Sequence, residues 1–448
     1  PNVMFILDDS GSMSWSYMPD EIRDDKDTKR AKSSEYNTIY YNPEVTYSPP
    51  VDHNGNSLGD ADFYNAWFDG YAADRDNNTV DLSRRFRPTW YYAGRSDEYA
   101  GRPEPAYYYV YDQQCGNKNN DACYRKVVVG PDEEQNFANW YSYYRSRIYA
   151  SRAAIGAAFS DFSNEFRVGW GRINKGSTNV DGVRVRAVEQ GVRPFDLDHK
   201  KDFYDWLYDV NPTGGTPLRS ALDGAGKYYE SRDSRGPWST TPGEFGGEDL
   251  TCRNSYTILM TDGYWNGSTP RGVGNADGSS GRRITAPDGT TYQYTPEDPY
   301  RDRFSNTLAD VAMHYWKRDL RPDLDNEVPT TAENEAFWQH MVTFGVGLGV
   351  EGTIDPDEAW AAVKTGDSIN WPNPTSSEPA KIDDLLHAGI NSRGGFFSTS
   401  DPDEFGRELK GILDNIAART GNAVASLATN SSEVQQDGGN IAYQARFD

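Results

Sequence analysis

The chain has 448 residues, which is enough for two or three average domains or for one domain with large insertions. Its formal charge of −23 argues against nucleic acid or an anionic membrane surface as a partner, because both repel a strongly acidic protein. No apolar run approaches the ~20 residues that span a bilayer, so we expect no transmembrane segment.

The first apolar run, Val3–Leu7, ends abruptly in acids and hydroxyls. This pattern predicts a buried strand whose carboxyl end opens into a site. Asp8, Ser10 and Ser12 follow it in the arrangement Asp-x-Ser-x-Ser. The arrangement alone is weak evidence, because Asp and Ser are common in turns.

Residues from about 15 to 135 are rich in Tyr, Asp, Asn, Gly and Pro, with only short hints of strands, and we interpret them as an insertion. Cys115 and Cys123 bracket a polar loop within it. A disulfide between them would clip that loop in an oxidising compartment. The third cysteine, Cys252, precedes a predicted strand and is expected to be a buried thiol.

A helix is predicted at 135–162, where apolar and small residues recur at helical spacing. We interpret its aromatic cluster as a contact between the insertion and the core, with a binding platform as the less favoured alternative. The cluster consists of Phe137, Trp140, Tyr141, Tyr143 and Tyr144.

Beyond this helix, strands alternate with helices, which predicts an α/β fold with a doubly wound, mainly parallel sheet covered on both faces. The strand 184–192 is expected to be the antiparallel edge partner of 166–173. Strands are predicted at 166–173, 184–192, 256–262, 341–350 and 395–399, helices at 202–209, 217–230, 304–319, 382–390 and 402–418, and further irregular insertions at 231–250, 265–299 and 351–380.

Two later positions complete the first motif. Thr216 stands at the head of a predicted helix in Gly-Gly-Thr-Pro, and Asp262 ends a second buried strand. Together with the first loop they offer oxygen ligands only. A hard cation such as Mg²⁺ takes about six oxygens at ~2.0–2.1 Å. Neutral hydroxyls would leave the ion under-neutralised, so that a spare coordination position attracts a carboxylate from a partner.

This combination resembles the von Willebrand factor A domain and its metal-ion-dependent adhesion site. The matching residues are Asp8, Ser10, Ser12, Thr216 and Asp262. The resemblance implies a Rossmann-like A domain over 1–420 that binds Mg²⁺, or alternatively Ca²⁺ or Mn²⁺. The insertion directly after Ser12 departs from the usual pattern, and an insertion rooted there could cap the ion.

Longer phrases narrow the resemblance to the PilY/PilC family of type IV pilus tip proteins. They are Asp-Asp-Ser-Gly-Ser-Met at 8–13, Tyr-Tyr-Asn-Pro-Glu-Val-Thr-Tyr at 40–47, Asn-Phe-Ala-Asn-Trp-Tyr-Ser-Tyr-Tyr-Arg at 136–145, Ser-Tyr-Thr-Ile-Leu-Met-Thr-Asp-Gly-Tyr-Trp-Asn at 255–266 and Tyr-Gln-Ala-Arg-Phe-Asp at 443–448.

This resemblance implies a secreted bacterial adhesin of the pilus tip and cell surface, outer membrane or periplasm, with roles in pilus assembly, retraction control and surface sensing. The implied partners are minor pilins, a host or surface ligand that offers a carboxylate, and the protein's own C-terminal β-propeller. We expect residues 421–448 to be a linker and the first strand leading to that further domain.

Two other functions compete with adhesion. One is a structural or mechanosensing tip component in which the metal only stabilises the fold. The other is a metal-dependent hydrolase using Ser10 or an activated water, which is disfavoured because no Gly-x-Ser-x-Gly surrounds Ser10 and no histidine has metal-binding spacing. We therefore expect a protein that is not an enzyme, with its histidines in surface or packing roles: His53, His199, His314, His340 and His387.

Overall fold

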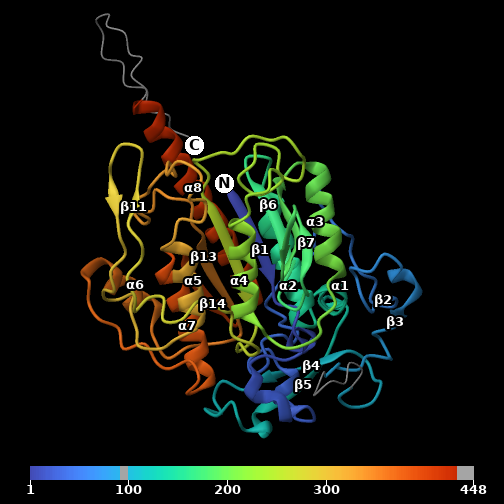
Figure 1. Cartoon of the computed structure of the whole chain (residues 1–448). Coiled ribbons are helices and arrows are strands. Elements are labelled where there is room, and N and C mark those ends of the chain that lie inside the picture. Colours follow the sequence, from blue (N-terminus) through green and yellow to red (C-terminus); the bar gives the residue numbers. More distant parts are fainter. Residues whose placement is uncertain (91–98, 431–448) are drawn as a thin grey trace, which may run out of the picture.

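The computed structural model describes residues 1–90 and 99–430, and its centre is a six-stranded sheet (Figure 1). The strand order is β14-β13-β10-β1-β6-β9, in which only β9 is antiparallel to its neighbour. The predicted mainly parallel α/β sheet is therefore confirmed. Its strands are β1 (Asn2–Leu7), β6 (Arg167–Arg172), β9 (Val188–Pro194), β10 (Ser255–Thr261), β13 (Val342–Leu348) and β14 (Gly395–Thr399).

Helices cover both faces of the sheet, as predicted (Figure 1). Successive side chains of a strand point to opposite faces. Accordingly Val3 and Phe5 of β1 belong to one hydrophobic core, and Met4 belongs to the other. The first core lies under α2 (Arg147–Ser160), α3 (Leu197–Asp209) and α8 (Pro402–Asn430), and the second lies under α4 (Leu218–Tyr229), α5 (Leu308–Trp316) and α7 (Glu378–Asn391).

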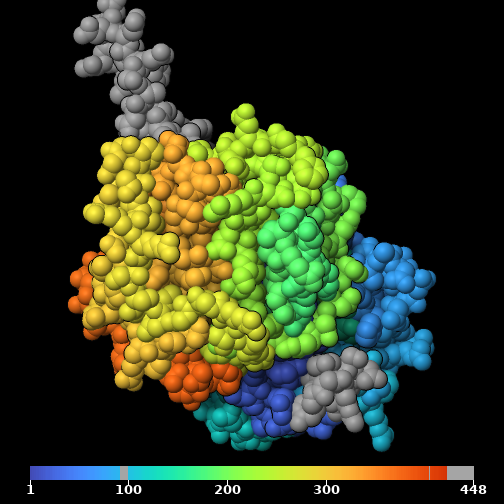
Figure 2. Space-filling view, in the orientation of Figure 1, coloured from blue at the N-terminus to red at the C-terminus, as the bar shows by residue number. Residues whose placement is uncertain are grey.

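The first insertion has a third core, made largely of aromatic side chains. It contains the antiparallel pairs β2 (Ala66–Trp67) with β3 (Thr79–Val80) and β4 (Tyr107–Tyr111) with β5 (Tyr124–Val128), and it packs on α1 (Glu134–Tyr143). Phe137, Trp140 and Tyr141 of α1 are buried in this core, so the aromatic cluster is a packing contact between insertion and body. Figure 2 shows the insertion, in blue, along one side and the lower part of the molecule.

The single helix predicted at 135–162 is wrong, because the structure has two helices there, α1 and α2. Ser146 begins the second helix, where its hydroxyl accepts a hydrogen bond from Tyr149 N at 3.3 Å. A serine in this position satisfies one of the free N–H groups of the first turn. The break directs Arg147 N to Trp15 O at 3.0 Å, and thereby ties α2 to the start of the insertion.

The irregular excursion predicted at 351–380 contains a helix, α6 (Pro356–Thr365), and the prediction is corrected accordingly. Asp355 caps its first turn by accepting from Asp357 N at 2.9 Å. Gly366 ends it with φ of 76°, a left-handed conformation that glycine adopts without strain. The helix signals at both ends were therefore present in the sequence.

Three smaller expectations also change. The helix α8 continues past 420 to Asn430, so residues 421–430 are helical; the strand expected near the end of the chain falls in 431–448, outside the described residues. Cys252 is exposed rather than buried. The segment predicted as one edge strand at 184–192 is divided between β8 (Val183–Val185), which pairs with β7 (Thr178–Val180), and β9.

The insertion predicted at 265–299 carries a short hairpin, β11 (Ile284–Thr285) with β12 (Thr291–Tyr292). Within residues 1–90 and 99–430, no helix combines the length and the apolar content needed to cross a membrane.

Candidate metal-ion site at the carboxyl ends of β1 and β10

The five predicted residues come together at one edge of the sheet. Strands β1 and β10 are parallel neighbours, with Ile6 opposite Leu259, so that their carboxyl ends carry Asp8 and Asp262 side by side. In Figure 1, β1 runs from the N label towards the insertion strands β4 and β5, which lie beyond its carboxyl end. Ligands of open α/β sheets bind at this edge.

The hydroxyls of the first loop converge on Asp262. Ser10 Oγ lies 2.9 Å from Ser12 Oγ, and Ser12 Oγ donates to Asp262 Oδ1 at 2.9 Å. A Cβ atom placed on Gly263 would lie 3.8 Å from Ser12 Oγ and 3.9 Å from Thr216 Oγ1. The small residue after Asp262 thus lies close to the hydroxyls contributed by two separate loops.

The loop that carries Thr216 is held in place by backbone contacts. Gly11 N donates to Gly214 O at 3.1 Å, and Thr213 N donates to Asp9 O at 2.6 Å. Asn266 clamps Thr216 from the other side, because its Oδ1 accepts from Thr216 N and its N donates to Thr216 O, both at 2.9 Å. These contacts join the three loops that carry the candidate ligands.

The two carboxylates are buried and interact unfavourably with each other. Asp8 Oδ1 accepts from Ser10 N at 2.7 Å, and its Oδ2 accepts from Thr261 Oγ1 at 2.7 Å. Burial, and then the charge of Asp262, raise the pKa of Asp8 to about 8. Burial also raises the pKa of Asp262. A bound cation would favour the charged forms, and the oxygen-only donor set fits a hard divalent ion.

Sequence reasoning missed Arg147, which is the counter-ion of the site. It is fully buried at the start of α2, where its guanidinium donates to Asp262 Oδ2 at 3.0 Å and to Asp20 Oδ1 at 2.6 Å. Its Nε donates to Tyr17 O at 2.9 Å. Arg147 thus fixes one oxygen of Asp262 and leaves the other facing Ser12, while linking the site to the first insertion. The sequence carries no local signal for this long-range contact.

Asp9, which lies between the predicted ligands, has a supporting role. Its Oδ1 accepts from Asn174 N at 2.9 Å and from Asn174 Nδ2 at 3.0 Å, and Asn174 Nδ2 also donates to Gly215 O at 2.8 Å. These bonds anchor the loop that carries Thr216 to the end of β6. Burial raises the pKa of Asp9.

The first insertion covers one side of the site and leaves the other open. Ser12 lies within the 3-10 turn η1 (Gly11–Ser14), and Trp15, which follows this turn, stacks on Tyr17, which stacks on Trp90. Asp8 and Asp262 are fully buried. On the opposite side Ser12 is partly exposed, and Gly214, Gly215 and Asn266 are exposed. The site is therefore reachable from the loop that carries Thr216.

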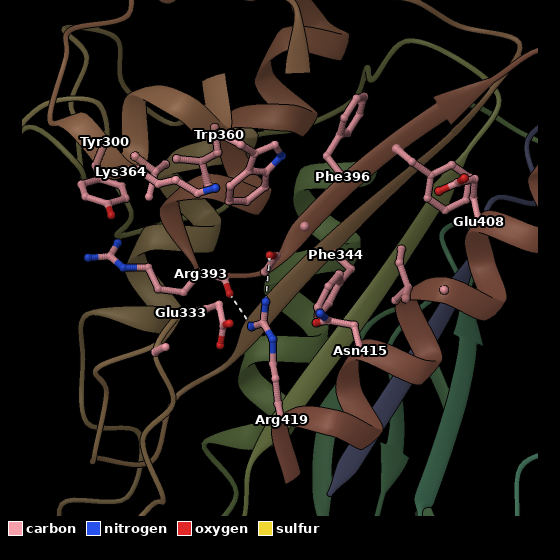
Figure 3. A pocket seen from close by; sticks show the side chains of 18 of the residues that line it. Tyr300, Glu333, Phe344, Trp360, Lys364, Arg393, Phe396, Glu408, Asn415 and Arg419 are labelled. Carbon is pink, nitrogen blue, oxygen red and sulfur yellow. Dashed lines mark hydrogen bonds between the residues drawn. The ribbon is translucent and has the colours of Figure 1, made fainter. Parts of the chain in front are cut away.

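A cavity of about 840 Å³ lies elsewhere, beside the free edge of β14 (Figure 3). Trp360 of α6, Phe396 of β14 and Asn415 of α8 are among the residues that line it. Arg419 closes one end by donating to Arg393 O at 2.6 Å and to Gly394 O at 3.4 Å. None of the five predicted ligands lines this cavity, so we do not assign the predicted chemistry to it.

The predicted bridge between Cys115 and Cys123 is present in the structure. Their Cα atoms lie 5.8 Å apart across a sequence separation of 8. The bridge lies in the connection between β4 and β5, distant in sequence from the candidate ligands, and Cys123 is buried next to Tyr111 and Tyr124. The bridge therefore has a structural role in the connection between β4 and β5.

Comparison with known proteins gives relatives along the whole chain. The type IV pilus biogenesis factor PilY1 of Pseudomonas aeruginosa strain PAK is 34% identical over 492 aligned residues, which cover 100% of this chain and 41% of the relative. PilY1 of strain UCBPP-PA14 is 37% identical over 480 residues, covering 98% of this chain and 39% of the relative. The chain thus spans about two-fifths of the length of these curated relatives. No family model matches it.

Among solved structures, two crystal structures of the pilus adhesin SpaC from Lactobacillus rhamnosus GG share TM-scores of 0.30 and 0.28 with this chain, at 12% and 11% identity. Each match covers 60% of this chain and 28% of the other. Scores this low carry no argument about fold or function.

Proposed function

We propose that the chain is the adhesive, metal-binding part of a pilus-tip factor. The premise is that the chain belongs to the family of the PilY1 type IV pilus biogenesis factors, which it matches over about two-fifths of their length. The observation that carries the proposal is the convergence of Ser10, Ser12 and Thr216 with two buried carboxylates at the carboxyl edge of the sheet. The ion we expect there is Mg²⁺, with Mn²⁺ or Ca²⁺ as alternatives.

The side chains of the site would make different contributions to binding the ion. Ser10, Ser12 and Thr216 offer neutral oxygens, while Asp8 and Asp262 supply the negative charge. Arg147 reduces the charge on Asp262, which keeps the site from neutralising a divalent ion fully. The bound ion would supply a positive charge with a spare coordination position for a carboxylate of a host or surface ligand. The opening beside Ser12 and Gly215 gives that ligand access.

The overall charge supports an ion-mediated mechanism. At −23 the chain repels a carboxylate-bearing surface, so a direct electrostatic attraction does not explain such binding. A cation held at the edge of the sheet makes the electrostatic potential positive there, so that a carboxylate is attracted. Minor pilins at the pilus tip and the protein's own β-propeller are the further partners we propose, and the location is the pilus tip or cell surface.

One observation favours the alternative of a structural or mechanosensing component. Arg147 connects Asp262 directly to Asp20 and Tyr17 of the insertion, so a force on the insertion would be transmitted to the site. A hydrolase gains no such support. Ser10 Oγ contacts Ser12 and, at 3.5 Å, Asp262, whose charge is already paired with Arg147, so that Ser10 lacks a strong base.

The test is binding of the purified chain to carboxylated beads, with amide-capped beads as the reference, in Mg²⁺ and in a chelator. We expect binding to carboxylated beads in Mg²⁺ only. Thr216→Val, which removes one hydroxyl at constant shape, should abolish it, whereas Thr213→Val in the exposed part of the same loop should not.

Equal binding in chelator, or undiminished binding by Thr216→Val, would refute adhesion through the ion. Loss of stability in chelator together with unchanged binding would instead support the structural alternative.

A further inference from the structure

A second polar cluster is buried between helix α7 and residues 265–307, the predicted insertion 265–299 together with the segment that leads into α5. Asp277 and Asp302 come from the insertion, and His387 comes from α7, with one ligand atom of each within 4.8 Å of the others. The side chains of Asp277, Asp302 and His387 are 0%, 6% and 2% exposed. The cluster shares no residue with the five-oxygen site at the ends of β1 and β10.

The hydrogen bonding of His387 leaves one ring nitrogen with a free lone pair. Nε2 lies 2.6 Å from Tyr300 O, and because a carbonyl only accepts, Nε2 carries the proton and donates it. A neutral imidazole carries a single N–H, so with the proton on Nε2 the other nitrogen, Nδ1, is unprotonated. A histidine that donates its N–H to a backbone carbonyl and keeps the other ring nitrogen free has the tautomer and orientation typical of metal ligands.

The ring is also fixed in orientation. It stacks on Trp371, with centroids 3.9 Å apart and an interplanar angle of 5°. Trp371 is itself tethered, because its Nε1 donates to Pro299 O at 2.7 Å. This arrangement holds the imidazole without any contribution from a charged partner, as a preorganised ligand requires.

The free nitrogen faces a carboxylate without a proton to share. His387 Nδ1 lies 3.7 Å from Asp302 Oδ2, which is too long for a hydrogen bond and brings two electron-rich atoms together. His387 Nε2 lies 3.6 Å from Asp277 Oδ2. Around a tetrahedral ion with bonds of ~2.0–2.1 Å, ligand atoms lie about 3.3 Å apart. The distance between Nδ1 and Asp302 Oδ2 therefore matches two ligands that share a cation better than it matches a hydrogen bond. The distance to Asp277 is measured from the protonated Nε2, and a carboxylate oxygen of Asp277 completes the group, whose ligand atoms lie within 4.8 Å of one another.

The two acids of the cluster accept hydrogen bonds but form no direct ion pair with a lysine or arginine among the described residues. Both acids are buried, with side chains 0% and 6% exposed for Asp277 and Asp302. Among the described residues, neither acid has a lysine or arginine within 4.0 Å. The nearby Lys317 uses its ammonium on Ala276 O at 2.5 Å and Ser279 O at 2.7 Å. Two buried carboxylates without a close cation are costly.

An independent observation comes from Asn391, which lies one helical turn beyond His387. Its Nδ2 donates to Asp277 Oδ2 at 2.9 Å, and its side chain also lies against His387. Its Oδ1 is buried and has no hydrogen-bond partner among the described residues. A buried amide oxygen without a partner costs free energy, and here it lies beside the cluster.

We propose that Asp277, Asp302 and His387, assisted by Asn391, bind a divalent ion of the Zn²⁺ type that fastens the insertion 265–307 to α7. One imidazole nitrogen and two carboxylates suit zinc, which takes nitrogen and oxygen ligands in tetrahedral sites. The neutral hydroxyls of the other site suit Mg²⁺ instead. The zinc site does not depend on the proposed adhesion, and it makes the insertion a metal-stabilised part of the fold.

The test uses the chain in a Cys252→Ser background, so that the exposed thiol takes no part in zinc uptake. After chelation and dialysis, Zn²⁺ alone is titrated calorimetrically into the parent, Asp302→Asn, His387→Gln and the control His53→Gln. We expect the parent and the control to bind one ion per chain. The other two variants should lose more than about tenfold in affinity, since even changes behind the ligands cost about 10–100-fold.

A second measurement does not depend on any variant folding correctly. Crystals of the parent chain soaked in Zn²⁺ should give an anomalous peak among Asp277, Asp302 and His387. The proposal is overturned if the parent fails to bind Zn²⁺, if both ligand variants bind as the parent does, or if the peak lies elsewhere. Thr216→Val should leave zinc binding intact, which separates this result from a failure of the Mg²⁺ site.

Discussion

Arg147 is the residue that decides how Asp262 is presented. It is buried with two carboxylate partners, Asp262 and Asp20. Removing one member of a buried ion pair leaves the other charge uncompensated, which costs about 3–5 kcal/mol. We therefore expect Arg147→Met to lower the free energy of unfolding by that amount in urea denaturation.

Arg172→Met is the control for this prediction. Arg172 is 31% exposed and its nearest carboxylate oxygen, on Glu189, lies 3.2 Å away. Partly exposed pairs of this kind contribute about 1 kcal/mol or less. Equal losses in the two variants would show that Arg147 is not the counter-ion of the site.

His340 should make the stability depend on pH. It is buried between Asn334 and Trp338 O, and burial lowers its pKa to about 4. The unfolded chain, with an ordinary histidine pKa near 6.5, then binds more protons than the folded chain between pH 6.5 and 4. This contribution to stability is complete above pH 6.5 and is lost as the pH falls through 4.

We expect His340→Gln to reduce the acid-induced loss of stability by up to roughly 3 kcal/mol, the value of a shift of this size. The measurement is urea denaturation of both chains at a series of pH values. Comparing the two chains removes the contribution of buried carboxylates with raised pKa, which has the opposite sign. Identical pH profiles would contradict a neutral buried His340.

Among the elements, the pairing of β6 with β9 depends on a close approach of backbones. The register shifts at Gly171, where a Cβ atom would lie 1.7 Å from Ala187 O. We expect Gly171→Ala to destabilise the chain by about 1–3 kcal/mol, the usual cost of overpacking. Gly176→Ala is the matched control, because a Cβ there meets nothing within 4 Å. Thermal or urea unfolding that fails to distinguish the two variants would contradict this packing.

Elements of the sheet could be predicted because each central strand is a short apolar run bounded by polar turns. The break between α1 and α2 was missed because residues 144–146 contain neither Gly nor Pro, and only the cap by Ser146 marks it. The helix α6 was missed although Asp355, Pro356 and Gly366 mark its ends, because its polar composition was interpreted as a loop.

The candidate site, like the fold, could be predicted from the sequence only in part. Asp8, Ser10, Ser12, Thr216 and Asp262 stand in a recognisable order, and the topology of a parallel sheet brings them to one edge. Arg147 was not predictable, because its contact with Asp262 spans 115 positions and forms only when α2 packs beside β10. The role of His387 was hidden for the same reason, since its neighbours come from a distant insertion.

At the scale of the whole molecule, the insertions are built into the body rather than attached to it. The first insertion has its own aromatic core and reaches the carboxyl edge of the sheet through Trp15, Tyr17 and Arg147. In the insertion 265–307, Trp265 donates to Asp384 of α7, and the same carboxylate accepts from Leu308 N at the start of α5. The strongly acidic chain thus presents one edge where three loops converge, and we propose that a cation bound there allows it to bind acidic partners.

The most direct test of this account is calorimetric titration of Mg²⁺ into the metal-stripped chain, beside Thr216→Val and Thr213→Val. Saturable binding that is lost in Thr216→Val and retained in Thr213→Val is the predicted result. Absence of binding in the parent chain, or equal binding by the two variants, would contradict a Mg²⁺ site at the ends of β1 and β10.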